Sequence, residues 1–310
     1  MLALTLGKTI FSLYLIMAAG FVMQKIGIFK KNESRVLSLL VLYLVMPALI
    51  FSAYQIEALP RIRNGLLLAV AASAVIHIFL LILAVLQKKF LKYDELERCS
   101  IIYSNCGNLI IPLVYIIFGK EYVVYCTGYM TIFNILLWSH GEMLISGERK
   151  FNWRRILCNP NLIAVVCGLI IFFTGWRFPA EVQKSVDLLA GCIGPLTMLV
   201  IGMLLAELNV RTVKENPRLF PVVAWRLIIA PLAILVMLRF FPWHCGLDAG
   251  SSRNVLLITF IASMAPSANA VTMLAQKYDR NAVYANAIGV IGTVLCIITM
   301  PLLVWLYQAW

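Results

Sequence analysis

The sequence predicts an all-α polytopic membrane protein with about ten transmembrane helices and no soluble domain. Composition is the first reason, since 62% of the 310 residues are hydrophobic and only 13% are charged. Ordinary soluble domains contain about 45–50% apolar and about 25% charged residues. The second reason is that the apolar residues form runs near the roughly 20 residues that a helix needs to cross a bilayer. The third is that the connections between these runs are too short to form a domain.

The predicted transmembrane segments share a long apolar run bounded by charged or turn-forming residues. They are 7–28, 36–55, 65–87, 98–118, 122–146, 160–176, 184–206, 218–241, 253–276 and 281–308. The first has no convincing cleavage site and is longer than the apolar core of a signal peptide, so we expect it to be retained as a helix. The sixth is short, and the fourth and ninth contain prolines among polar residues.

Lys and Arg residues are divided unevenly between the two sides that these segments define. The connections after odd-numbered segments contain 17 of them, and the opposite side contains eight. Cytoplasmic loops of membrane proteins carry the excess of Lys and Arg. We therefore predict a multi-pass protein of the cell (inner) membrane with both termini outside. The net charge of +12 comes from these membrane-flanking clusters, so we expect no nucleic-acid partner.

Ten helices divide into two sets of five, and an odd number per set makes the second set run inverted to the first. Prolines recur in matching places, since Pro112 lies in the fourth segment and Pro266 in the ninth. The second and seventh segments also each contain a proline. We predict two inverted five-helix repeats, residues 1–150 and 151–310, with broken, crossing fourth and ninth helices.

Polar and small residues accompany the prolines of the fourth and ninth segments. Proline removes a backbone donor, and freed backbone groups in hydrocarbon must find other partners. Two broken helices that meet in the membrane direct their N–H groups and positive dipole ends at one point, which suits a carboxylate. We predict a substrate-binding site formed by Asn105, Gly107, Asn108, Pro112, Ser263, Pro266, Ser267 and Asn269. The alternative is a pair of proline kinks packed by small residues.

Acidic residues are absent from the middle of the predicted segments. Glu142 lies near the cytoplasmic end of the fifth segment, and Asp187 lies at the start of the seventh. Sodium- and proton-coupled carriers usually place carboxylates deep in the membrane, so the pattern favours an anionic substrate over such coupling. Arg226 lies about eight residues into the eighth segment. Two interpretations stay open, because it can snorkel to the cytoplasmic edge or attract an anion.

Motifs of enzymes and of metal sites are absent from the sequence. It contains no zinc-protease pattern, phosphate-binding loop or nucleophile elbow. The eight cysteines are scattered, with no C-x-x-C and no Cys/His ligand spacing. We expect no enzymatic activity, no cofactor and no metal, and we expect a small organic anion and the lipid bilayer as partners.

A series of motifs runs along nearly the whole chain. It comprises Asn105-x-Gly-x-x-x-x-Pro112-Leu, Phe118–Gly119, Asn159–Pro160–Asn161, Gly194–Pro195–Leu196 with Gly202, Pro231–Leu232, Pro266–Ser267–Ala268–Asn269 and Pro301–Leu302. In order and spacing these motifs resemble the auxin efflux carrier family, the bacterial relatives of the plant PIN transporters. Two features depart from the family pattern. Ile110 stands where glycine is frequent, and the connection 148–159 is too short for the regulatory loop of many plant members.

The resemblance implies a secondary transporter of a small organic anion, such as a mono- or dicarboxylate, that works by elevator-type alternating access. It implies that the broken helices cross at Pro112 and Pro266. It also implies a homodimer, a scaffold of helices 1, 2, 6 and 7, and a moving transport domain made of the rest. The alternative function is a cation-coupled symporter or antiporter, driven by Na⁺ or H⁺, of the bile-acid-transporter type on a similar fold.

Overall fold

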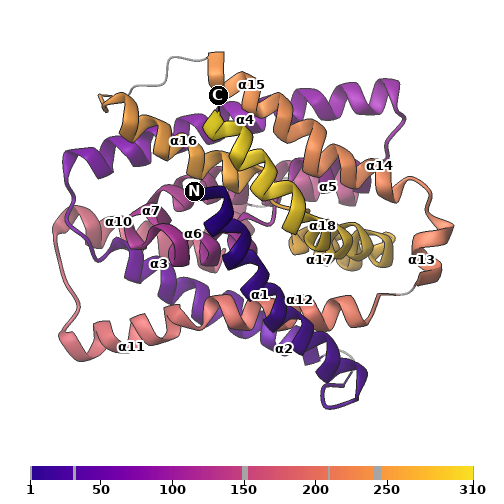
Figure 1. The fold of residues 1–310 in the computed structure, drawn as a ribbon, viewed down its shortest axis with the longest axis horizontal. Coiled ribbons are helices and arrows are strands. Elements are labelled where there is room, and N and C mark those ends of the chain that lie inside the picture. Colours follow the sequence, from indigo (N-terminus) through magenta and orange to yellow (C-terminus); the bar gives the residue numbers. More distant parts are fainter. Residues whose placement is uncertain (1, 31–32, 149–152, 209, 241–245, 310) are drawn as a thin grey trace.

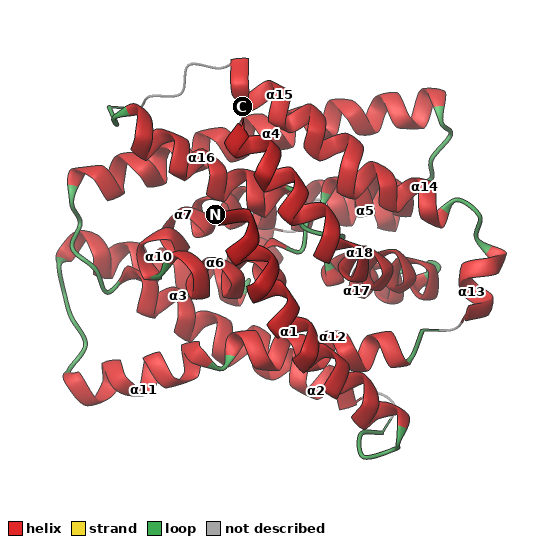
Figure 2. Ribbon diagram, in the orientation of Figure 1, coloured by secondary structure: helices red, strands yellow, loops and turns green. Residues whose placement is uncertain are grey.

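The structure is a computed structural model that describes residues 2–30, 33–148, 153–208, 210–240 and 246–309. Within these ranges the regular secondary structure is helical (Figure 2), and one isolated antiparallel bridge joins Ser104 to Ser267. The all-α prediction is confirmed for the described residues. Within the described ranges, six helical segments are long and apolar enough to cross a membrane, and two shorter apolar helices accompany them.

The α-helices are α1 (Leu2–Lys25), α2 (Glu33–Leu40), α3 (Met46–Tyr54), α4 (Pro60–Phe90), α5 (Glu95–Ile102), α6 (Ile111–Phe118), α7 (Lys120–Leu136), α8 (Glu142–Ser146), α9 (Trp153–Leu157), α10 (Pro160–Thr174), α11 (Ala180–Gly191), α12 (Ile193–Ala206), α13 (Val210–Glu215), α14 (Leu219–Ala224), α15 (Ala230–Phe240), α16 (Ala249–Ser263), α17 (Asn269–Lys277) and α18 (Ala282–Ala309). The described residues also contain four π-helical turns, η1 (Val41–Val45), η2 (Cys106–Ile110), η3 (Leu137–Gly141) and η4 (Trp225–Ile229). Of these, η1, η3 and η4 each join two α-helices, and η2 directly precedes α6.

Each predicted transmembrane segment overlaps helical structure, and the fourth and ninth segments each overlap two helices separated by a break, at 103–105 and 264–268. The ends differ by several residues, because a helix continues beyond the apolar run that a sequence marks. The segment predicted at 65–87, for example, belongs to α4, which begins with Pro60 in its first turn and continues through Lys88 and Lys89. Proline is favoured in a first turn, where its missing N–H has no helical partner. The two-repeat arrangement of these segments stays a prediction.

Helices α1 and α12 pack with their backbones in contact (Figure 1). A Cβ atom at Gly20 would overlap the carbonyl oxygen of Leu199, and one at Gly202 would overlap that of Met17. Only glycine fits at either position. Small residues that let helix backbones approach closely are a common basis of helix association in membranes, where no hydrophobic effect drives helices together.

Helices α1 and α18 run antiparallel beside each other (Figure 1). The Tyr14 hydroxyl donates to the carbonyl of Thr293. About two helical turns nearer the chain ends, Gly7 faces Pro301. The first and last helices therefore run in opposite directions, as they must in a protein with an even number of membrane crossings.

Candidate functional site

The two interrupted segments meet at their interruptions. Helix α5 ends at Ile102 and η2 begins at Cys106, whereas α16 ends at Ser263 and α17 begins at Asn269. The Asn105 N–H donates to the Pro266 carbonyl at 2.8 Å, and the Ala268 N–H donates to the Tyr103 carbonyl at 2.9 Å. The two breaks thus satisfy part of each other's backbone, as hydrocarbon requires. We call this antiparallel contact of residues 103–105 with 266–268 the crossing.

Two helix N-termini lie at the crossing. The first backbone hydrogen bonds after it run from Leu109 to Asn105 at 3.3 Å and from Val271 to Ala268 at 3.0 Å. The two N–H groups that precede each of these donors have no partner among the described residues. Free N–H groups and the positive end of the helix dipole make a helix N-terminus a site for anions.

Asn105 supplies a side-chain donor in the same place. The residue is 4% exposed, and its Nδ2 atom has no hydrogen-bond partner within the described part of the chain. Buried amide donors are nearly always paired, because an unmade hydrogen bond costs about 1–3 kcal/mol. An unpaired amide beside two helix N-termini has the donors that an anionic ligand would need.

The other predicted site residues divide between the crossing and its surroundings. Ser263, Pro266 and Ser267 are buried at the crossing, and the Ser263 hydroxyl donates to the Phe260 carbonyl at 2.7 Å. The residues that open the two new helices are half-buried, namely Gly107, Asn108 and Asn269. Seven of the eight predicted residues thus lie in or directly beside the breaks. What these residues bind stays a prediction.

Pro112 is the exception, and the expectation that the helices cross at both prolines is wrong. Pro112 lies in the first turn of α6, seven positions after Asn105, whereas Pro266 is in the crossing itself. The π-helical turn η2 explains the difference. The Ile111 N–H donates to the Cys106 carbonyl five residues earlier, so the helix changes register just before the proline. Pro112 therefore lies inside a continuous helical segment, directly after the π-helical turn, and not in the crossing.

Arg226 is the functional candidate for which the sequence left two interpretations open. Its side chain is 1% exposed, so the interpretation that it snorkels to the cytoplasmic edge is wrong, whereas the interpretation that it attracts an anion stays a prediction. Its guanidinium donates to the carbonyls of Ile101, Ser263 and Ala265, at 2.7, 2.6 and 2.7 Å. The first two carbonyls belong to the ends of α5 and α16, and the Ala265 carbonyl lies in the break after α16. The sequence signal was an Arg inside an apolar run, which marks a functional residue by default.

The two carboxylates considered from the sequence have partners outside the crossing. Glu142 accepts from Lys277 Nζ at 2.8 Å and from the Tyr278 hydroxyl at 2.5 Å, which links α8 to α17. Asp187 accepts from Lys120 Nζ at 2.7 Å and from the Ser52 hydroxyl at 2.5 Å. The described residues contain no group of three or more His, Cys, Asp or Glu side chains that could hold a metal ion.

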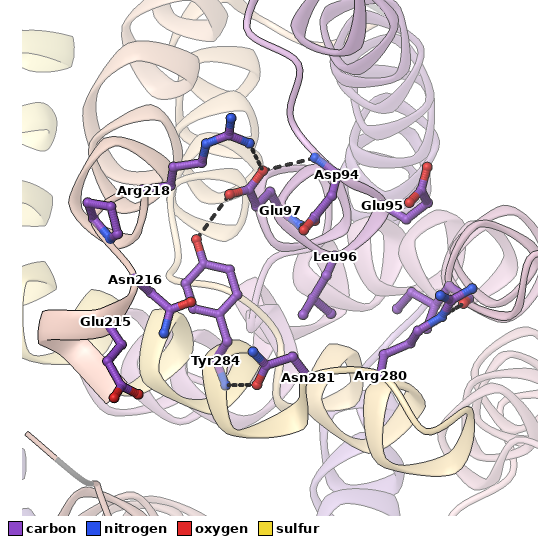
Figure 3. A pocket seen from close by; sticks show the side chains of 12 residues that line it. Asp94, Glu95, Leu96, Glu97, Glu215, Asn216, Arg218, Arg280, Asn281 and Tyr284 are labelled. Carbon is purple, nitrogen blue, oxygen red and sulfur yellow. Dashed lines mark hydrogen bonds and ion pairs between the residues drawn. The ribbon is translucent and has the colours of Figure 1, made fainter. Parts of the chain in front are cut away.

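A pocket of about 370 Å³ lies near the ends of α5, α8 and α18 (Figure 3). The buried Glu97 is one of the residues that line it. Its carboxylate accepts from the Tyr284 hydroxyl at 3.1 Å and lies 3.7 Å from Arg218 Nη1. Four carboxylates and two guanidinium groups line the pocket, and none of the eight predicted site residues does. Its acidic lining does not suit an anion, so the crossing is the better candidate.

Comparisons with known proteins agree with the membrane fold. A family model described as membrane transport protein matches residues 5–151 and 148–304. An uncharacterized transporter of Methanothermobacter thermautotrophicus is 24% identical over 304 residues, which cover 95% of this chain and 96% of that protein. A protein of Rhizobium meliloti named "Putative malonate transporter" is 21% identical over 293 residues, which cover 88% of this chain and 87% of that protein.

Proposed function

Because the chain belongs to the membrane transport protein family, as its auxin efflux carrier motifs predict, it is a multi-span membrane transporter, and we propose that it carries a small organic anion. A mono- or dicarboxylate is the proposed substrate class. The single observation that carries this proposal is the unpaired Nδ2 of the buried Asn105, beside two helix N-termini with free N–H groups. The name of the Rhizobium meliloti relative makes malonate the first probe.

The chemistry of the crossing suits a carboxylate for three reasons. Asn105 and the free N–H groups are donors, and a carboxylate is a pure acceptor. The described ion pairs place no carboxylate side chain at the crossing, so no fixed negative charge opposes the ligand there. Arg226 adds a buried positive charge behind the two breaks. Donors that are fixed before the ligand arrives cost little ordering when it binds.

We propose ten transmembrane helices in two inverted repeats, residues 1–150 and 151–310, and elevator-type alternating access in a homodimer. The antiparallel bridge between Ser104 and Ser267 supports the repeats, because a two-fold axis in the membrane plane makes equivalent strands antiparallel. The opposite directions of α1 and α18 support an even helix count. The scaffold and transport domains follow the division that the family resemblance implies.

Transport by the purified protein tests the proposed function. We expect proteoliposomes loaded with unlabelled malonate to accumulate radiolabelled malonate by exchange. Succinate and acetate in excess should compete, whereas an uncharged amide of similar size should not. Liposomes without protein give the background. Failure of every mono- and dicarboxylate in such a panel to exchange or compete, with folded protein in the membrane, would rule out an organic anion carrier.

Removal of the Glu142 carboxylate should leave transport largely intact. Glu142 pairs with Lys277 and Tyr278 and is not part of the crossing. We therefore expect Glu142→Gln to retain more than about a tenth of the parent exchange rate, since an obligatory coupling carboxylate lies deep in a carrier. Asp187→Asn is the matched control, and we expect it also to retain more than about a tenth of the parent exchange rate. Complete loss of exchange in folded Glu142→Gln with malonate binding intact would instead favour the proton-coupled alternative.

Both termini should be accessible from outside the cell. The excess of Lys and Arg on the connections after odd-numbered segments is the physical reason. A Trp310→Cys variant, made in a background without the natural cysteines, should react with a membrane-impermeant maleimide on whole cells. A cysteine placed at Ser146, on the opposite side, should react only after permeabilisation. The reverse labelling pattern would contradict the predicted orientation.

A further inference from the structure

Arg226 holds the ends of two helices at once. It lies in η4, and its three nitrogen atoms each donate to a different carbonyl. The Nη1 atom binds Ile101 at the end of α5, and Nη2 binds Ser263 at the end of α16. The Nε atom binds Ala265, within the break after α16. The planar fork of a guanidinium can reach three carbonyls in this way, whereas a lysine ammonium is a compact charge that cannot span them.

The charge of Arg226 is matched by backbone dipoles. No carboxylate forms an ion pair with it among the described residues. Two of its backbone partners, Ile101 and Ser263, are at helix C-terminal ends, and the third, Ala265, follows the end of α16 by two residues. A helix C-terminus carries roughly half a negative elementary charge. Two such ends at one point therefore balance about one positive charge, and without it the carbonyls would repel each other in a medium of low dielectric.

Broken helices in cation-coupled carriers meet the same electrostatic demand in another way. There, unwound carbonyls and half-helix C-terminal ends bind the coupling Na⁺ or H⁺. In this chain the carbonyls of Ile101, Ser263 and Ala265 are already occupied by a guanidinium that is part of the protein. A bound cation would have to displace a buried residue that makes three charge-assisted hydrogen bonds.

We propose that Arg226 is a built-in cation that holds the crossing together and makes anion transport independent of a coupling cation. The inference rests on the proposed function, because it concerns how an anion carrier is driven. Arg226 is a positioning residue. It orders the two breaks, and through them it positions Asn105 and the two helix N-termini. Because its own charge balances the carbonyl dipoles, the site binds the substrate anion without a bound Na⁺ or H⁺.

The first test measures the cation requirement of the unaltered protein. Malonate exchange in proteoliposomes should change less than about twofold when choline replaces Na⁺ on both sides at constant pH, because a fixed guanidinium is always charged. A fall of tenfold or more without Na⁺ would overturn the inference and leave the carrier function standing. Absence of exchange under every condition would instead contradict the proposed function. The second test would still examine the role of Arg226, because its thermal unfolding measurement does not depend on transport.

The second test replaces the guanidinium and then returns it. Arg226→Ala should lower the thermal unfolding midpoint of the protein in nanodiscs. Millimolar guanidinium chloride should raise that midpoint again, relative to choline chloride of the same ionic strength, because the ion fits between the three free carbonyls. The exposed Arg239 is the matched control, since it lies on the adjoining α15 and Arg239→Ala should gain nothing from guanidinium.

Transport adds a readout that a purely structural residue would not give. Exchange by Arg226→Ala should be at least about a hundredfold slower than by the parent, since three hydrogen bonds to a charged group are lost. Added guanidinium should restore part of the lost exchange rate. Arg226→Lys keeps the charge but loses the planar fork, so its exchange rate should lie between those of the parent and Arg226→Ala. Equal responses of Arg226→Ala and Arg239→Ala to guanidinium would overturn the inference.

Discussion

Asn105→Ala is expected to weaken malonate binding roughly tenfold to a hundredfold, because a hydrogen bond to a charged ligand contributes about 1.5–3 kcal/mol. The Nδ2 atom of Asn105 has no protein partner in the described residues, so its loss leaves no protein group unsatisfied. The folded protein should therefore keep its thermal stability. Isothermal titration of malonate into parent and variant in nanodiscs measures the effect.

Asn105→Asp should bind malonate more weakly still, because a fixed negative charge repels the anion. Asn161 offers a matched control on α10. It is also buried, and its Oδ1 also lacks a partner, but it lies away from the crossing. Asn161→Ala should bind like the parent. If well-folded Asn105→Ala and Asn269→Ala both bind and exchange malonate like the parent, the crossing is only a packing feature.

Gly202→Val is expected to prevent folding of most of the protein. A Cβ at Gly202 would overlap the Met17 carbonyl and would lie 2.8 Å from the Phe21 backbone nitrogen. Neither atom is a movable side chain, so α1 and α12 must separate. Overpacking typically costs about 1–3 kcal/mol, and separation of this interface should cost more. Size-exclusion profiles and thermal unfolding in detergent measure the loss, and Gly20→Val should behave alike.

Gly7→Ala is the control for this prediction. Gly7 also lies on α1, but the nearest atom to an added Cβ is the Pro301 Cγ at 3.9 Å, which is an ordinary contact. The variant should fold and exchange malonate like the parent. Normal monodispersity and stability of Gly202→Val would show that α1 and α12 do not pack as the structure has them.

The helical segments were predictable because the bilayer fixes their length and composition. The breaks were also predictable, since Asn, Ser, Gly and Pro inside an apolar run leave backbone groups that need partners. The exact crossing was not. Pro112 and Pro266 look equivalent in the sequence. In the structure Pro112 lies in α6, directly after the π-helical turn η2, whereas Pro266 lies in the crossing.

The role of Arg226 could not be read from its position in the chain. An Arg about eight residues into a transmembrane segment can reach the membrane edge or remain inside. Which of the two positions the side chain takes depends on whether the protein interior offers hydrogen-bond acceptors for the guanidinium. Here they are carbonyls of two other segments, from Ile101 and from Ser263 and Ala265, more than thirty positions away in the chain. No local sequence pattern contains that information.

The most direct test of the anion site is the position of a heavy-atom ligand in an experimental structure. Diffraction from crystals grown with bromomalonate, recorded at the bromine absorption edge, locates the ligand without assumptions about its contacts. We expect the anomalous peak between the N-termini of η2 and α17, within reach of the Asn105 amide. A peak in the pocket around Glu97, Arg218 and Tyr284, with none at the crossing, would contradict the proposed site.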